Sequence, residues 1–113
     1  MSEYITNESY VATVRERVVA TARSMVDGSF SFLEGARTLS ALRHDAAVRE
    51  DDSDFMTFVA IDSETDDLPI GAIRQHWSQE ALDKLDPEIK EAEEWARKVG
   101  LEACESLIRR FHV

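Results

Sequence analysis

The sequence predicts an all-α protein, a single-domain bundle of four to five helices whose longest helix lies at the C-terminus. In several segments apolar residues recur at spacings of three and four, the period of one helical face. No two segments show the alternation of apolar and polar residues that paired strands require. With 113 residues, 43% of them hydrophobic, the chain is long enough for one core, so we assign residues 1–113 to one domain.

Two helices are predicted in the first part of the chain. The first begins after Asn7, a residue suited to the N-cap position, and ends at Gly28. Its apolar stripe consists of Val11, Val14, Val18, Ala22 and Met25. The second follows the serines of "GSFSF", and its stripe consists of Phe32, Ala36, Leu39 and Leu42. Gly35 weakens this second helix by up to about 1 kcal/mol relative to Ala, but it permits close contact with another helix.

The segment "FMTFVAI", residues 55–61, fits either a buried strand or a buried helix. We interpret it as a helix, because a strand here would lack a partner. The stripe of this helix consists of Phe55, Phe58, Val59 and Asp62. After it, Pro69 is expected in the first turn of a further helix that Asp66 or Asp67 caps.

The last third of the chain is predicted to contain the longest helix. "SQEALDKL" is interpreted as a short helix or turn capped by Ser78, and Asp86-Pro87 as the start of the long helix, with Pro87 at its first position. Its buried stripe consists of Ile89, Ala92, Ala96, Val99, Ala103, Leu107 and Phe111. Three charged pairs at i,i+4 spacing, each expected to contribute about 0.2–0.5 kcal/mol, are Glu93–Arg97, Glu94–Lys98 and Glu105–Arg109. Cys104 is expected in the core.

The net charge of −10 is unevenly distributed. Residues 45–77 contain nine Asp or Glu but only two Arg, a charge of −7, whereas residues 1–44 are neutral and residues 78–113 carry −3. A chain this acidic repels nucleic acids and anionic membranes, so a basic protein partner is favoured. The first ten residues lack the basic and apolar regions of a leader, and no apolar run approaches ~20 residues, so we expect a cytoplasmic protein.

We find no signature of catalysis, of a metal site or of a cofactor, and we predict that the protein is not an enzyme. Asp62, Glu64 and Asp66 alternate as ligands do at the start of an EF-hand loop. The sixth and twelfth positions of such a loop, however, are Asp67 and Ile73 instead of Gly and Glu. The three histidines are far apart in sequence, and neither a serine-nucleophile motif nor a glycine-rich phosphate loop occurs. An enzyme of unrecognised type is the weakest alternative.

The residues "FVAIDSETDDLPIGAIRQHW", Phe58 to Trp77, match the pattern FVxIDSETDxLPxGxxRxxW. Together with "EGARTLSALRHD" before it and "WSQEALDKLDPEIKEAE" after it, this pattern resembles a small family of uncharacterised bacterial proteins, some of them similar to toxin-immunity proteins. The resemblance spans residues 34–93, somewhat more than half of the chain, and implies no catalytic residue. It implies that residues 62–77 act as a unit. That unit is a structural corner, in which Arg74 pairs with Asp66 or Glu64, or a partner-binding face built on the same corner, and the two roles can coexist.

These observations predict an immunity-type inhibitor that neutralises a basic partner, such as a toxin domain, through an acidic surface. The alternative is a small helical accessory domain that acts as a homodimer through an apolar helix face. The candidate partner-binding residues are Glu50, Asp51, Asp52, Asp62, Glu64, Asp66, Asp67, Arg74, His76 and Trp77.

Overall fold

The structure, a computed structural model, describes residues 2–111, and their side chains from residue 7 onward. It contains α1 (Ser2–Asp27), α2 (Phe32–Leu42), the 3-10 segment η1 (Arg43–Asp45), α3 (Ser53–Thr65), the 3-10 segment η2 (Gly71–His76) and α4 (Gln79–Phe111). No strand occurs in this part of the chain. The all-α prediction and the C-terminal position of the longest helix are confirmed.

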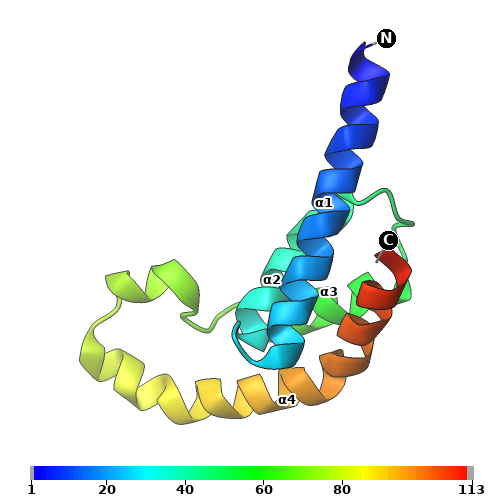
Figure 1. Ribbon diagram of the computed structural model, residues 1–113. Coiled ribbons are helices and arrows are strands. Elements are labelled where there is room, and N and C mark those ends of the chain that lie inside the picture. The colour runs from blue at the N-terminus through cyan, green and yellow to red at the C-terminus, as the bar shows by residue number, and fades with distance from the viewer. Residues whose placement is uncertain (1, 112–113) are drawn as a thin grey trace.

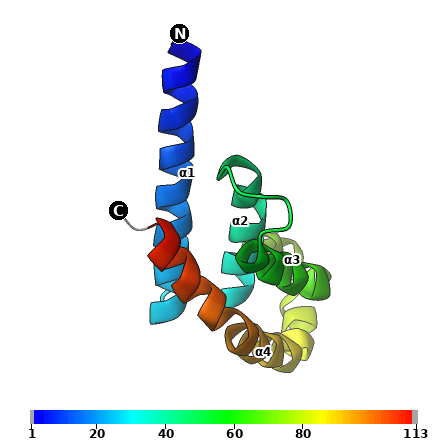
Figure 2. The same cartoon turned by 90° about the vertical axis from the view of Figure 1, so that its right-hand side faces the viewer.

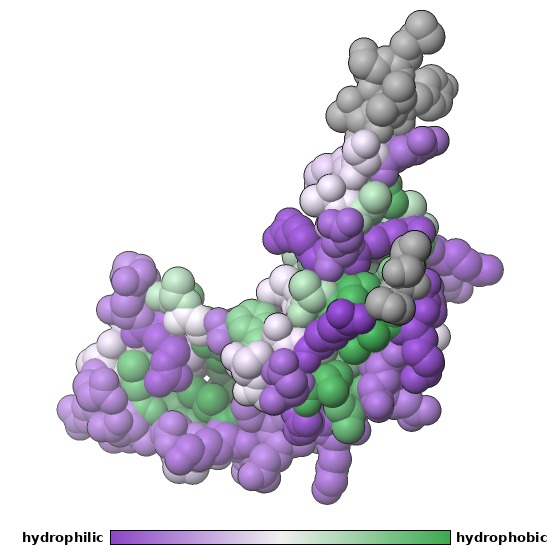
Figure 3. Space-filling model, in the orientation of Figure 1, coloured by the Kyte–Doolittle hydropathy of each residue, from purple (hydrophilic) through white to green (hydrophobic). Residues whose placement is uncertain are grey.

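Helix α4 packs against each of the other three α-helices, and so does α2. The first half of α4 runs along the base of the molecule and carries η2 outward as an arm, and its second half turns upward beside α1 (Figure 1). Helices α2 and α3 pack against each other on the other side (Figure 2). The beginning of α1 projects beyond the bundle, and the molecule measures 55 × 28 × 24 Å. Hydrophobic residues gather in the hollow between the arm and the bundle on the face shown in Figure 3.

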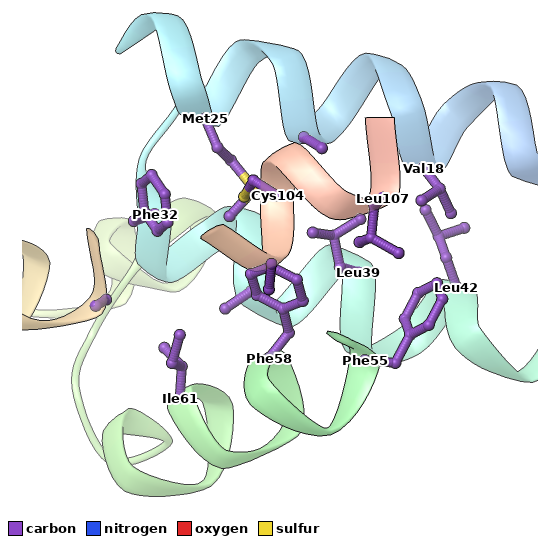
Figure 4. Packing of buried hydrophobic residues seen from close by; sticks show 14 of the residues in the cluster. Val18, Met25, Phe32, Leu39, Leu42, Phe55, Phe58, Ile61, Cys104 and Leu107 are labelled. Atoms are coloured by element: carbon purple, nitrogen blue, oxygen red, sulfur yellow. The ribbon is translucent and has the colours of Figure 1, made fainter. Parts of the chain in front are cut away.

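The core is built from the apolar stripes of the four α-helices. Figure 4 shows Phe55, Phe58 and Ile61 pointing from α3 toward α2 and the second half of α4. All three are fully buried, and each stabilises the fold by about 1.5–3 kcal/mol relative to an exposed position. The predicted burial of the stripes is confirmed for Val14, Val18, Ala22, Met25, Phe32, Ala36, Leu39 and Leu42. The helical interpretation of residues 55–61 is confirmed as well.

Two glycines allow the helices to approach closely. A Cβ at Gly35 would overlap with the Met25 side chain of α1, which confirms the close contact expected there. A Cβ at Gly100 would lie 3.1–3.2 Å from Phe32, Phe58 and Ile61, side chains that belong to α2 and α3. Gly100 is therefore a position of close approach between α4 and the other two helices.

Side chains of α4 hold the turn between α1 and α2. Arg97 donates hydrogen bonds to the carbonyl oxygens of Met25 (3.1 Å) and Val26 (2.9 Å), in the last turn of α1. Glu93 accepts hydrogen bonds from the Ser31 hydroxyl and the Leu33 N–H, both 2.8 Å, at the start of α2. The pairing of Glu93 with Arg97 predicted from their spacing is therefore wrong. Instead, each of the two residues hydrogen-bonds to groups at the end of another helix, where the backbone lacks intrahelical partners.

Three predicted helix boundaries are wrong. Helix α1 already begins at Ser2, because residues 3–6 contain neither Pro nor Gly to stop it, so Asn7 lies inside the helix. Pro69 is buried in an irregular segment, and η2 starts only at Gly71 without a side-chain cap. Pro87 lies inside α4. The Ser78 hydroxyl caps α4 by accepting from the Ala81 N–H, so the turns before Pro87 are already helical.

The predicted buried stripe of α4 is confirmed for Ala96, Ala103 and Leu107, whereas Ile89, Ala92 and Phe111 are only partly buried and pack against the core. Val99 of the predicted stripe is instead 45% exposed, and Gly100 and Cys104 are buried in its place. Because α4 approaches α2 and α3 closely, the face of α4 with the smallest side chains is the one that is buried. The spacing of apolar residues does not reveal this.

We expect Gly100→Val to lower the free energy of unfolding by about 1–3 kcal/mol, because the added methyl groups overlap with three ring or aliphatic side chains of the core. Chemical denaturation followed by circular dichroism measures this change. Lys98→Val, at an exposed position of the same helix, is the matched control and should cost no more than about 0.5 kcal/mol. Equal losses for the two variants would contradict the packing at Gly100.

The thiol of Cys104 is buried, as predicted, and this burial raises its pKa to about 12. Since only the thiolate reacts, a shift from 9.0 to about 12 reduces the reactive fraction about a thousandfold. We expect a thiol reagent such as dithiobisnitrobenzoate to label the folded protein at least about a hundredfold more slowly than the protein unfolded in guanidinium. Rapid labelling of the folded chain would contradict the burial of this residue.

Candidate partner-binding site

The predicted acidic residues lie at the two ends of α3. Glu50 and Asp51 belong to the turn before the helix, and Asp52 is its N-cap. Glu64, Asp66 and Asp67 lie at or just after its C-terminal end. Thirteen residues of helix separate the two groups by about 20 Å. The acidic residues therefore do not form one continuous binding face.

The group before α3 is largely engaged in structural contacts. Asp52 accepts hydrogen bonds from the backbone N–H groups of Asp54 and Phe55, and Arg110 of α4 pairs with both Asp52 and Asp54. The hydrogen bond from Arg110 is the main reason why the pKa of Asp52 lies below its usual value. Asp51 pairs with Arg49 at the surface, 3.0 Å apart. Of the candidates in this group, Glu50 alone has no ion pair within the described chain.

Asp62 contributes to the structure of the turn that follows α3. Its carboxylate lies 3.5 Å from Nε of Arg37, close enough for an ion pair, although this nitrogen makes no hydrogen bond. Nη2 of Arg37 donates to the carbonyl oxygens of Thr65 (2.6 Å) and Leu68 (3.2 Å). Arg37 thus satisfies carbonyl groups at the C-terminal end of α3, where positive charge is favourable.

The predicted pairing of Arg74 with Asp66 or Glu64 is wrong. Arg74 instead donates to the carbonyl oxygen of Pro69 over 3.4 Å, within its own segment. His76 and Trp77 lie at the end of η2, and both are exposed. Residues 62–77 therefore form a corner that Arg37 and Arg74 hold through backbone carbonyls.

A groove with four carboxylates lies between the C-terminal end of α3 and the first half of α4. We call it the acidic groove, and it is lined by Glu64, Thr65, Asp67, Leu68, Glu88, Glu91, Ala92 and Trp95. Its volume is about 350 Å³. Leu68 and Thr65 are buried at its base, whereas the four carboxylates and Trp95 are exposed. Trp95 keeps 40% of its surface in contact with solvent.

The four carboxylates of the acidic groove are uncompensated. Neither Lys nor Arg lines the groove, and in the described part of the chain none of the four makes an ion pair. Four like charges around one concave surface give a strongly negative local potential, which attracts cations. The indole of Trp95 adds a ring face, against which a guanidinium or an ammonium group can stack.

The alternating carboxylates at positions 62, 64 and 66 do not form a metal loop. Asp62 and Glu64 lie on α3, where residues two apart point to opposite sides of the helix, and Asp62 already pairs with Arg37. In the part of the chain that the structure describes, no group of three or more His, Cys, Asp or Glu side chains is arranged to hold a metal ion.

The sequence predicted only two of the four carboxylates of the acidic groove. Glu64 and Asp67 belong to the predicted set, but Glu88, Glu91 and Trp95 were not predicted. Their spacing of three and four along α4 places them on one helical face, which is the signal that the sequence does contain. What it lacks is any indication that this face lies against the end of α3.

No family model, no curated protein and no solved structure matches this chain. The resemblance of residues 58–77 to a bacterial family thus stays a prediction. None of the helices described is both long and apolar enough to cross a lipid bilayer.

Because Arg110 pairs with Asp52 and Asp54, the contribution of this residue to the free energy of unfolding should depend on pH. Arg110→Gln should lower the free energy of unfolding at pH 7 by about 1 kcal/mol, since solvent screens part of the interaction. Because the pKa of Asp52 is lowered from 3.8 in the folded protein, its contribution is complete above that pH and is lost as the pH falls below it. The difference between the wild-type protein and the variant should therefore shrink below about pH 4.

Urea denaturation at a series of pH values measures this difference. Arg109→Gln removes the same charge from the neighbouring exposed position and is the control, with no such loss at pH 7. A constant gap between the wild-type protein and Arg110→Gln down to pH 2 would show that Asp52 is not the linked group.

Proposed function

We propose that this protein is a non-enzymatic binding protein, an immunity-type inhibitor that occupies the basic surface of a toxin domain with its acidic groove. The observation that supports this function best is the convergence of Glu64, Asp67, Glu88 and Glu91 around the exposed Trp95. The overall charge of −10 favours the approach of a basic partner, and the groove supplies a local contact for it.

The chemistry of the groove favours an Arg side chain of the partner as the central contact. A guanidinium group can stack on Trp95 and donate several hydrogen bonds to the surrounding carboxylates in the same position. The apolar stem of the Arg would cover Leu68 and Ala92 at the base of the groove. Lys can neutralise the same charges, but its ammonium group cannot form the planar, forked contact.

The segments that form the acidic groove are held in place by other contacts, which favours binding. Thr65 and Leu68 at its base are fixed through their carbonyl groups by Arg37, and α4 presents Glu88, Glu91 and Trp95 from a regular helix. Side chains held by such elements lose less conformational entropy on binding than side chains of a mobile loop.

Binding to an arginine-rich peptide tests this function without knowledge of the natural partner. Trp77→Phe leaves Trp95 as the single tryptophan, so a titration reports on the groove through fluorescence. We expect saturable binding that weakens with salt. Replacing Glu64, Asp67, Glu88 and Glu91 by Gln or Asn should weaken it about tenfold, since each exposed pair contributes about 0.3–0.5 kcal/mol.

The matched control replaces four exposed acids outside the groove, Glu50, Glu94, Glu102 and Glu105, by Gln, which changes the net charge equally. Equal weakening by the two variants would show that overall charge, and not the groove, binds the peptide. The inhibitory role has a test of its own. Co-expression with a basic toxin domain encoded beside this chain should restore growth, and the groove variant should fail to restore it.

A further inference from the structure

A second groove lies between the projecting start of α1 and the end of α4, and its charge differs from that of the acidic groove. It has a volume of about 570 Å³. Its apolar lining comes from Val11 and Ala12 of α1, Ala47 of the turn before α3, and Phe111 of α4. Figure 2 shows the last turn of α4 beside α1, with the rest of α1 continuing past it.

The projecting part of α1 has an uncovered face. None of the side chains from residue 7 to residue 13 is buried, and Val14 is the first buried one. Val11 is only partly buried, and the Tyr10 hydroxyl donates a 2.9 Å hydrogen bond to Asp45, so these turns contact the rest of the chain on one side only. Helical turns with few packing contacts are marginally stable in water, so a covering surface would stabilise them.

The charged side chains that line this groove are of both signs, and one of them, Arg110, also pairs with Asp52 and Asp54. Glu8 and Glu16 carry two negative charges, and Arg15 and Arg110 carry two positive ones. The acidic groove carries four negative charges and no positive one, so two copies would repel each other there. For a protein with a net charge of −10, the groove beside α1 is a surface on which a second copy can dock without that repulsion.

We propose that this groove holds α1 of a second copy of the chain, in an antiparallel and symmetric pair of α1 helices. An alignment that places Val11 opposite Ala12 of the second copy also places Glu8 opposite Arg15, and twofold symmetry repeats both contacts. In the same alignment Glu16 faces Asn7, so no like charges meet. Each copy covers the projecting turns of the other.

Arg15 is positioned in advance for this contact. Its Nε and Nη2 donate to the carbonyl oxygens of Ala46 (2.8 Å) and Ala47 (3.2 Å), and its guanidinium carbon lies 4.9 Å from the centre of the Phe111 ring. A guanidinium has five N–H donors, so further donors remain for the second copy's Glu8. The side chain is thus ordered before association, which lowers the entropy that the dimer contact costs.

A pair of substitutions on adjacent residues of α1 tests the proposal. Ala12 lines the groove, whereas the next residue, Thr13, is exposed on another side of the helix and lines no part of it. In analytical ultracentrifugation the wild-type chain should form dimers at micromolar concentration, and Ala12→Glu should weaken the dimer at least about tenfold. Thr13→Glu adds the same charge and should leave the dimer intact. Circular dichroism checks that both variants fold.

The geometry of the pair has an independent test. Because Cys104 is buried, a cysteine introduced on α1 is the one accessible thiol among the described residues. Ala12→Cys, close to the twofold axis, should form a disulfide-linked dimer on mild oxidation, and Thr13→Cys should not. A wild-type chain that stays monomeric up to about 1 mM, or an Ala12→Glu chain that dimerises as the wild type does, would overturn the proposal. Both tests leave the acidic groove unchanged, so the proposed function can stand or fall separately.

Discussion

The fold depends on the way α4 holds the turn between α1 and α2. The last carbonyl groups of α1 and the first N–H groups of α2 lie next to each other at this turn, and helix ends leave such groups without intrahelical partners. Arg97 places a positive charge at the negative end of α1, and Glu93 places a carboxylate at the positive end of α2. Since these two residues are one helical turn apart, a single stretch of α4 satisfies both ends.

Further contacts of α4 follow from that position. Three residues beyond Arg97, Gly100 meets the side chains of Phe32, Phe58 and Ile61, where a larger side chain would keep the helices apart. Ten residues later, Arg110 reaches the N-terminal end of α3 and pairs with Asp52 and Asp54. Helix α4 therefore contacts the ends of the three other α-helices with charged side chains and fills the space between them with small ones.

The local features of the sequence predicted the helices and most of the core, because both arise from periodicity within one segment. Contacts between segments could not be predicted from periodicity. Glu93 and Arg97 have the spacing of a surface pair, but unsatisfied backbone groups of another helix bind them more favourably than they bind each other. Val99 fits the apolar period as well as Gly100 does, and the size of the neighbouring rings decides between them. The acidic groove joins residues more than twenty positions apart, for which no local pattern exists.

The net charge alone does not select the carboxylates of the proposed binding site, since several acidic residues serve the fold. Asp52 and Asp54 bind Arg110, and Asp62 lies beside Arg37. Glu64 and Asp67 remain uncompensated, and α4 adds Glu88 and Glu91 to them instead of a basic residue. Unpaired like charges at short range disfavour the folded state. Keeping four of them around an exposed Trp is the kind of compromise between stability and function that binding sites show.

The acidic groove lies on the first half of α4 and the groove beside α1 on its last turn, with Glu88 and Arg110 about 30 Å apart along the helix. A dimer formed through α1 would therefore leave both acidic grooves accessible. Each groove would bind a separate basic domain, so a complex of one dimer with two partners follows from the two proposals together. A partner that presents two basic surfaces would bind such a dimer more tightly than it binds one chain, because the second contact forms within the same complex. Association of the chain would in this way strengthen binding without any new contact at the groove.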